Sequence, residues 1–377
     1  MFRISLFIVN IVSFIILISF AQQLFAMSNN DFIDIKIFSK EKTLQNITIN
    51  SNTELLSLKK TLFLKEKWNI KSDKKFLILY NHKTKHHLPD KITLNSLNNS
   101  PICIGINSQS RYYNRCYTGN IKIVLINNQL QLINNLPVID YLYSTVGSEL
   151  PQGWPEEAVK TQAIIIHTYL NYALKNHIIL EDTTQNQFYG GVNYINKSYK
   201  IYIDEVKNII ITDKNNLPIE ALYHSTCAGE TLNNENVFGG KPRYYLRSVK
   251  CYHDSDSNFY STKVSNIYKE LLKKIFHTSR LKFIKDKDNR LNLIVTDNKT
   301  YTPYQFWIIV GKELGWGKIP GVKFKVDCLK DKCKITSKGA GHAVGLCQWG
   351  ARGLALKGFT YRQILQYYYK GISFFTN

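Results

Sequence analysis

Short runs in which apolar and polar residues alternate occupy the chain from about residue 32 to about residue 135. The clearest runs are IDIKIF, NITIN, KFLILY, KITLN and IKIVL, and they are separated by Asn, Ser and Lys. A period of two is the pattern of half-buried β-strands. We therefore expect β structure in this part, and no catalytic constellation is visible in it.

The pattern changes at Leu136, where LPVIDYLYSTVGSELPQGWPEEAVKTQAIIIHTYLNYALKNH predicts two helices joined by a kinked loop. Pro155 suits the first turn of a helix, and Glu156 and Glu157 suit its positive end, so the second helix is expected to begin near Trp154. From Asp182 to about Asp254 the runs YKIYIDEV, NIIITD and PIEALYHS predict a return to short strands.

Residues 258–301 resemble a peripheral insertion, with a Lys-rich helical run (VSNIYKELLKKIF) followed by a polar strand pair. Near the C-terminus a Gly-rich loop precedes a short helix that Gly358 ends. Thr360 and Gln363 then predict a capping box for a last helix that ends before Gly371. The predicted class is α+β, with a β-rich region at 27–116 and a mixed α/β domain with a cleft at 117–374.

The N-terminus has the form of an export signal. Arg3 precedes an apolar run over residues 4–20, and small residues follow at Ala21 and Ala26. This predicts that residues 1–26 are a signal peptide or an uncleaved membrane anchor, and that the rest works outside the cytoplasm, in the periplasm or cell envelope.

The chain is strongly basic, with 49 Lys and Arg against 28 Asp and Glu, for a net charge of +21. Such a surplus of positive charge favours binding to an anionic partner. However, the Lys bias runs through the whole sequence and forms neither a basic stripe nor a nucleic-acid motif. We therefore do not expect nucleic-acid binding.

Seven cysteines in an exported chain allow three disulfides and one free thiol. Cys328 and Cys333 flank a tight turn between two alternating runs, which favours a bridge across a hairpin. The next expected pairs are Cys103 with Cys116 and Cys227 with Cys251. A zinc site is the alternative for the last pair, since two histidines lie close in sequence: His224 and His253.

Three segments together resemble the SpoIID/LytB family. They are VGSELPQGWPEEAVKTQAIIIHTY (146–169), YHSTCAGETLNNENVFGG with YLRSV (223–249), and GAGHAVGLCQWGARGLALKGFTYRQILQYYY (339–369). Members of the family typically read SE-x-P…WP-x-EAL-x-AQA-x-AARTY, then HS-x-x-GG-x-T, then GHGVGMSQWGA. The resemblance extends over roughly residues 117–374, and the order and length of the motifs make a chance match implausible.

The resemblance implies a peptidoglycan lytic transglycosylase. Such an enzyme breaks the bond between N-acetylmuramic acid and N-acetylglucosamine without water and leaves a 1,6-anhydro end. In the sporulation branch the substrate is glycan that an amidase has stripped of its stem peptides. The alternative from the LytB branch is a non-catalytic wall-binding protein that enhances an N-acetylmuramoyl-L-alanine amidase. Neither function calls for a metal or another cofactor.

Glu149 is the expected acid and base. One carboxyl group suffices because the sugar's own 6-hydroxyl attacks, so no second carboxylate is needed to activate water. The acid must hold its proton near neutral pH, and the neighbours Val146, Leu150 and Trp154 offer apolar surroundings. The local sequence alone would leave Glu149 a solvated loop carboxylate, and the family resemblance favours the catalytic role.

Lys160 and His167 are seven residues apart, so they share one face of the second helix and are expected to bind substrate. The family has Lys and Arg at these positions, and His167 departs from it. His342 in the Gly-rich loop, Gln348 and Trp349 are the other expected substrate contacts, with Trp349 suited to a sugar face. Cys347 stands where the family has Ser; a thiol nucleophile paired with His342 is disfavoured, because no orienting Asn or Asp is evident.

Overall fold

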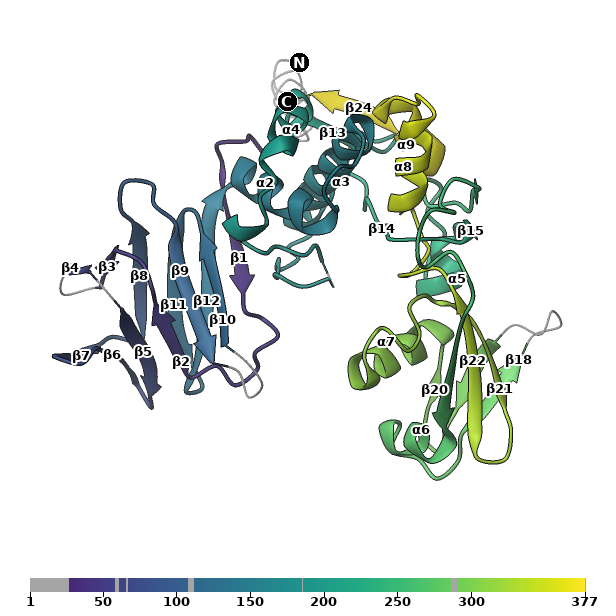
Figure 1. The fold of residues 1–377 in the computed structure, drawn as a ribbon, viewed down its shortest axis with the longest axis horizontal. Helices are drawn as coiled ribbons and strands as arrows, with labels where there is room; N and C mark the ends of the chain where they lie inside the picture. Colours follow the sequence, from purple (N-terminus) through teal and green to yellow (C-terminus); the bar gives the residue numbers. More distant parts are fainter. Residues whose placement is uncertain are drawn as a thin grey trace, which may run out of the picture.

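Two six-stranded antiparallel sheets form the N-terminal part of the molecule (Figure 1). The computed structural model describes residues 27–57, 61–65, 67–107, 112–184, 186–285 and 291–376, so the predicted export segment lies outside the described residues. The first sheet has the order β1 (Phe32–Ile37), β12 (Gln129–Pro137), β11 (Asn120–Ile126), β8 (Lys91–Ser96), β3 (Thr53–Leu56) and β4 (Thr61–Leu64). The second has the order β10 (Tyr112–Tyr117), β9 (Ile102–Asn107), β2 (Asn46–Ile49), β5 (Trp68–Asp73), β6 (Phe76–Tyr80) and β7 (Lys85–Leu88).

The alternating sequence pattern explains these sheets. In β1 the side chains of Ile33, Ile35 and Ile37 are buried while the residues between them are more exposed, as one buried face requires. The strands β11 and β12 extend the first sheet to Pro137, so the β-rich part of the fold includes residues that the sequence assigned to the second domain. The chain is α+β, as predicted.

Helices gather around α3 (Glu156–Lys175) in the middle of the molecule (Figure 1). Its neighbours are α2 (Val138–Glu149), α4 (Lys200–Val206), α8 (Gln348–Leu356), α9 (Tyr361–Tyr368) and the strand pair β13 (Ile209–Thr212) and β24 (Ser373–Thr376). The prediction for α3 was correct to within two residues, since Pro155 precedes its first turn. The capping box of Thr360 and Gln363 at the start of α9 is confirmed.

The run YKIYIDEV was wrongly predicted as a strand. Its residues form the end of the 3-10 turn η2 (Lys197–Tyr199) and then α4. Tyr199, Ile203 and Val206 are its buried side chains, and their spacing of four and three is that of a helix that packs one face on α3.

Residues 263–338 form a lobe away from the sheets (Figure 1). It contains β17 (Lys263–Tyr268), α6 (Lys269–Ile275), β18 (Lys282–Lys285), β19 (Leu291–Val295), β20 (Thr300–Tyr301), α7 (Pro303–Leu314), β21 (Lys323–Cys328) and β22 (Lys332–Lys338). The predicted Lys-rich helix is in fact strand β17 followed by the shorter α6. Because β17 pairs with β22, the lobe reaches beyond the 258–301 segment that the sequence marked as peripheral.

Short elements connect this lobe to the helices. They are β14 (Tyr223–His224), β15 (Gly229–Glu230), α5 (Asn234–Phe238), β16 (Lys250–Cys251) and β23 (Leu346–Cys347). The 3-10 turn η1 (Val192–Tyr194) instead contacts α2 and β10. Within the described residues, no helix combines the length and the apolar character that a membrane crossing requires.

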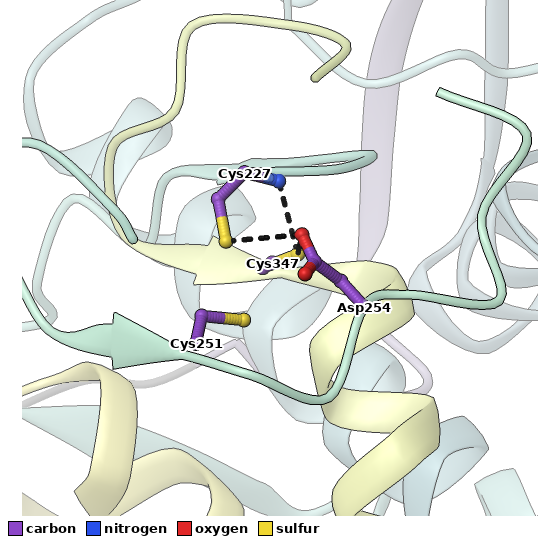
Figure 2. Close-up of side chains that lie close together, drawn as sticks. All are labelled: Cys227, Cys251, Asp254 and Cys347. Atoms are coloured by element: carbon purple, nitrogen blue, oxygen red, sulfur yellow. Dashed lines mark hydrogen bonds between the residues drawn. The ribbon is translucent and has the colours of Figure 1, made fainter. Parts of the chain in front are cut away.

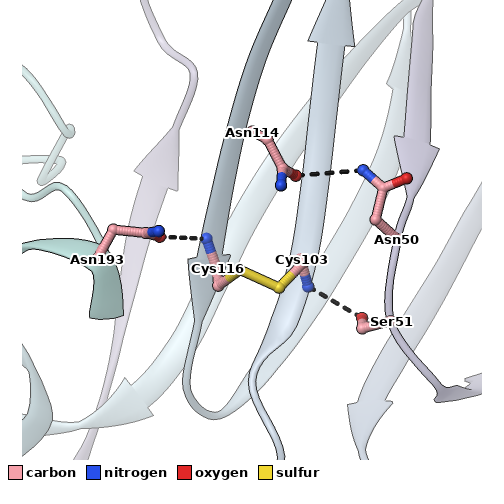
Figure 3. Close-up of a disulfide and its surroundings, with 6 residues drawn as sticks. All are labelled: Asn50, Ser51, Cys103, Asn114, Cys116 and Asn193. Carbon is pink, nitrogen blue, oxygen red and sulfur yellow. Dashed lines mark hydrogen bonds between the residues drawn. A yellow bond between two sulfur atoms is a disulfide. The ribbon is translucent and has the colours of Figure 1, made fainter.

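Two of the three predicted disulfides are confirmed. Cys103 and Cys116 join β9 to β10 (Figure 3), and Cys328 and Cys333 close the β21–β22 hairpin. The predicted Cys227–Cys251 bridge is wrong, because both residues are free and buried.

The sheets are held to the helical part by Asp182. Its buried carboxylate accepts hydrogen bonds from the backbone N–H groups of Phe38 (2.8 Å) and Ser39 (3.1 Å) and pairs with Arg115 at 2.9 Å. The Cys116 N–H donates to Asn193 nearby at 2.9 Å (Figure 3). Charge-assisted bonds of this kind fix the segment after α3 against β10 and the end of β1.

Candidate active site around Glu149

Glu149 is the last residue of α2. The helix ends there because Leu150 precedes Pro151 and takes extended backbone angles (φ −113°, ψ 132°), which the proline favours. The Glu149 side chain is half-buried, and its Oε1 accepts a hydrogen bond of 2.8 Å from the Phe188 N–H. The carboxyl group is therefore held in a defined position at the end of a buried helix.

Burial raises the pKa of Glu149 above its usual range, because the ionised form loses solvation. The Phe188 N–H opposes this rise, and so do the side chains of Tyr223 and Gln348, which lie beside the carboxyl. The net effect is a pKa above the usual range. A proton donor near neutral pH needs this property, which the sequence predicted from apolar neighbours.

Tyr223 and Gln348 reach Glu149 because their segments pair. Strands β14 and β23 are parallel, with Tyr223 opposite Leu346 and His224 opposite Cys347, so Gln348 leaves the pair at the first residue of α8. Gln348 was predicted as a substrate contact, whereas Tyr223 was missed. Its place directly before the HST part of the second motif was the only signal that could have found it.

Several buried polar groups near the carboxyl lack a protein partner within the described residues. The Tyr223 hydroxyl lies beside Glu149 without the geometry of a direct hydrogen bond, and Gln162 Nε2 and Gln187 Nε2 are also unpaired. The oxygen ends of both amides are used, since Gln162 Oε1 accepts from Gln348 at 3.4 Å and Gln187 Oε1 accepts from Tyr141 at 2.8 Å. Unpaired buried donors are costly, and they are suited to hydroxyl and acetamido groups of a ligand.

Trp349 lies in an aromatic pair with Trp154, with ring centroids 5.5 Å apart and an edge-on arrangement. The Arg352 guanidinium carbon lies 5.3 Å from the centroid of the Trp349 ring, and the Trp349 side chain is half-buried. Trp154 belongs to the loop that follows Glu149, so this pair joins α8 to the loop of the candidate acid.

His342 is half-buried beside His224, with the two rings 5.5 Å apart. Its Nδ1 accepts the N–H of Val344 at 3.1 Å, and burial lowers its pKa to about 4. Because Nδ1 accepts a bond from its own loop, the neutral His342 ring carries its proton on Nε2 and can donate a hydrogen bond from there. It contacts the backbone of Tyr223 and not the Glu149 carboxyl.

The glycines of the 339–345 loop approach the chain itself. A Cβ on Gly345 would lie 2.1 Å from the Leu222 oxygen, and one on Gly341 would lie 2.9 Å from the His224 Cβ. Both residues also have positive φ angles, of 71° and 93°. These close approaches are made to the 222–226 segment and hold the loop against β14.

Lys160 lies in an ion-pair network rather than beside Glu149. Its Nζ pairs with Glu156, with Glu205 at 2.5 Å and with Glu157 at 3.6 Å, and its side chain is only 8% exposed. Burial lowers its pKa, but the bonds to Glu156 and Glu205 outweigh this and the net pKa is raised. The charge predicted to bind substrate is already compensated, and it ties α3 to α4.

A cavity of about 410 Å³ lies elsewhere, between β17 and the turn after α7. It is open, and none of its lining residues is a predicted site residue. The unpaired groups around Glu149 are therefore the better guide to a binding site.

Sequence comparisons agree with this geometry. A profile of the family described as "SpoIID: Stage II sporulation protein" matches residues 126–213, which span α2, the loop of Glu149 and α3. An uncharacterized protein of Brachyspira hyodysenteriae is 30% identical over 267 residues, covering 68% of this chain and 71% of its own length. The chain belongs to the SpoIID/LytB family.

Two further relatives carry names. Stage II sporulation protein D of Bacillus subtilis is 28% identical over 265 residues, which is 64% of this chain and 75% of that protein. The Amidase enhancer of Bacillus subtilis is 23% identical over 291 residues, which is 61% of this chain and 39% of that protein. The SpoIID/LytB chain described here is thus similar to representatives of both branches.

His167, where this SpoIID/LytB chain departs from the family's Arg, lies in the core. Its ring is 1% exposed and both ring nitrogens lack a hydrogen-bond partner within the described residues. It faces the backbone of Met27, Lys207 and Ile209, and burial lowers its pKa to about 4. The residue at this position therefore affects packing between α3 and its neighbours and makes no contact with Glu149.

Proposed function

We propose that this protein is a peptidoglycan lytic transglycosylase with Glu149 as its single acid and base. The observation that carries the proposal is the raised pKa of a carboxyl group held by the Phe188 N–H at the point where the three family segments meet. No second carboxylate is among the groups that set this pKa within the described residues. A one-carboxylate mechanism fits such a site.

In this mechanism protonated Glu149 donates its proton to the oxygen between C1 of N-acetylmuramic acid and the departing N-acetylglucosamine. The C1–O bond breaks, and the 6-hydroxyl oxygen of the same sugar forms a new bond to C1. The Glu149 carboxylate takes the proton of that hydroxyl, which restores the acid and leaves a 1,6-anhydro end. Water is not consumed, so a second carboxylate has no task.

Substrate contacts come from the groups around the acid. Gln348 and the unpaired donors of Gln162 and Tyr223 suit hydroxyl and acetamido oxygens, and Trp349 offers an aromatic face to a sugar ring. Because the charge of Lys160 is taken up by glutamates, recognition would depend on neutral hydrogen bonding and stacking. Such a site favours a glycan whose stem peptides have been removed. The proposed place of action is the cell envelope, with export or anchoring through the N-terminal segment.

A second candidate is a non-catalytic enhancer of a cell-wall amidase. The similarity to a protein named Amidase enhancer and the absence of a free cation from the positions of Lys160 and His167 favour it. An enhancer would bind glycan and an amidase without changing the glycan.

The decisive experiment incubates the purified protein with intact and with amidase-stripped peptidoglycan and measures anhydro-muramyl ends by mass spectrometry. We expect such ends with the wild type and none above background with Glu149→Gln. Glu313→Gln, which changes an exposed glutamate of the distant lobe, is the matched control and should behave as wild type. Equal yields from Glu149→Gln and wild type, or no ends from either, would exclude the enzyme.

A further inference from the structure

Three thiols and one carboxylate meet in the interior, close to the β14–β23 pair. They belong to Cys227, Cys251, Asp254 and Cys347, and one ligand atom from each lies within 4.8 Å of the others. Figure 2 shows the side chains converging from three separate segments. All four residues are fully buried.

The spacing of these atoms matches a tetrahedral metal site. Zinc–sulfur bonds of about 2.3 Å place two sulfur ligands of a tetrahedron about 3.8 Å apart. The Asp254 carboxylate Oδ2 lies 3.2 Å from Cys227 Sγ and 3.6 Å from Cys347 Sγ. A metal ion at the centre would need only small side-chain shifts.

The protein alone does not satisfy this cluster. Asp254 is fully buried, and its Oδ1 has no hydrogen-bond partner among the described residues. The nearby cation, Lys323, donates instead to the backbone oxygens of Cys227, Ala228 and Glu230 at 2.9–3.3 Å. A carboxylate enclosed with three sulfur atoms is unfavourable unless a positive charge compensates it.

Backbone and hydroxyl donors surround the sulfur atoms as they do in metal–thiolate sites. Cys347 is the N-cap of α8, and its Sγ accepts the N–H of Gly350 at 3.4 Å and that of Cys227 at 3.3 Å. The Tyr368 hydroxyl lies 3.2 Å from Cys251 Sγ, and the Ala228 N–H donates to Asp254 Oδ2 at 2.6 Å. Such outer donors hold ligands in place and stabilise negative sulfur.

We propose that Cys227, Cys251, Asp254 and Cys347 bind one Zn²⁺ ion as a closed structural site. Thiolate ligands select zinc over calcium and magnesium, and four protein ligands leave no open position for a substrate. Binding replaces the protons of the three thiols, which pass to solvent. The ligand set differs from the one suggested by sequence spacing, because the His224 Nδ1 is bonded to the Val344 oxygen and neither His224 nor His253 joins the cluster.

The site fastens the segments that carry the partners of Glu149. Cys347 immediately precedes Gln348, and Cys227 follows Tyr223 by four residues. Asp254 and Cys251 add the segment around β16. The ion would therefore position Tyr223 and Gln348 and take no part in the chemistry.

Metal content tests the inference without an activity assay. The full chain, purified under reducing conditions without chelator, should contain one zinc per molecule by inductively coupled plasma mass spectrometry. Replacement by Co²⁺ should give a thiolate charge-transfer band and the visible bands of a tetrahedral ion. A zinc-free wild type that cannot be loaded with Zn²⁺ or Co²⁺, or a disulfide between two of the three cysteines in protein purified without reductant, would overturn the proposal.

Matched variants separate ligand loss from misfolding. Asp254→Asn keeps the size of the side chain, and it should weaken zinc binding in competition with a chelator by about tenfold or more, since even outer contacts are worth that much. Asp254→Cys should keep one zinc and resist the chelator at least as well as wild type. The double change of Cys328 and Cys333 to Ser, which removes a distant hairpin bridge, should keep one zinc. Equal zinc affinity in Asp254→Asn and wild type would refute the ligand assignment, whatever the outcome for glycan cleavage.

Discussion

The substitution Glu149→Gln tests the proposed chemistry most directly. The amide keeps the size of the carboxyl group, and its oxygen can still accept the Phe188 N–H that holds Oε1 at 2.8 Å. The amide, however, has no acidic proton to donate and cannot act as the base. General acid or base catalysis contributes about 10²–10⁴-fold to a rate. Because Glu149 would serve in both proton transfers, we expect the upper part of that range, a barrier increase of about 4–5 kcal/mol.

The same substitution should stabilise the fold at neutral pH. Because burial raises the pKa of Glu149, the folded state binds this proton more tightly than the unfolded state does. Stability is therefore lost as the pH rises from the unfolded pKa through the folded one, at about 1.4 kcal/mol for each unit by which the pKa is raised. Glutamine avoids this cost. The variant should have the higher melting temperature at pH 7, and the difference should vanish below about pH 4, where the wild-type carboxyl is protonated in both states.

The assays are anhydro-end release and melting temperature measured on the same preparations across pH. The wild-type rate should fall as the pH rises above the raised pKa, since the first step needs the protonated acid. A variant that is inactive but less stable than wild type at pH 7 would mean that Glu149 is an ion-paired structural residue. That result would refute the argument from burial.

Three further outcomes are expected. Asp182→Ala removes the acceptor of two backbone N–H groups and leaves Arg115 unpaired, so urea unfolding should show a loss of about 3 kcal/mol or more. Lys160→Met leaves the carboxylates of Glu156 and Glu205 close together without a cation between them, so calorimetry should show a loss of stability on the order of 1–2 kcal/mol. Glycan cleavage per folded molecule should be unchanged. Reduced cleavage at unchanged stability would instead assign Lys160 to substrate binding. Because the pKa of His167 is lowered to about 4, the folded state binds fewer protons, and stability should fall by roughly 2 kcal/mol between pH 7 and pH 5. His167→Leu should remove that dependence in urea titrations at the two pH values.

Local signals predicted the elements whose ends are set by their own residues. The capping box of Thr360 and Gln363 and the turn before Glu156 needed no tertiary information, because the bonds involved lie within one turn of helix. The run YKIYIDEV shows the limit of this approach. Its alternation suits a strand, but the packing of Ile203 and Val206 on α3 fits a helical spacing, and tertiary contact decided the outcome.

The candidate site residues also differ in how far the sequence could predict their surroundings. Lys160 and His167 do lie on one helix, as their spacing required, yet α3 is surrounded by other elements and is buried on several faces. A helix in that position has no single solvent face, so a shared face did not place these residues in one binding site. Sequence spacing likewise could not choose the partners of Cys227, because Asp254 and Cys347 arrive from segments 27 and 120 residues away.

Glu149 illustrates why the end of its helix could be located from sequence while the distant residues that set its pKa could not. Its position follows from local rules, since Pro151 ends the helix at that residue. Its pKa depends on Phe188, Tyr223 and Gln348, which are 39 to 199 residues distant, and the β14–β23 pair brings the last two to it. Any change that loosens this pair should shift the pKa of Glu149, because Tyr223 and Gln348 are among the groups that set it. Loss of the proposed zinc should then change the pH dependence of glycan cleavage while leaving Glu149 itself in place.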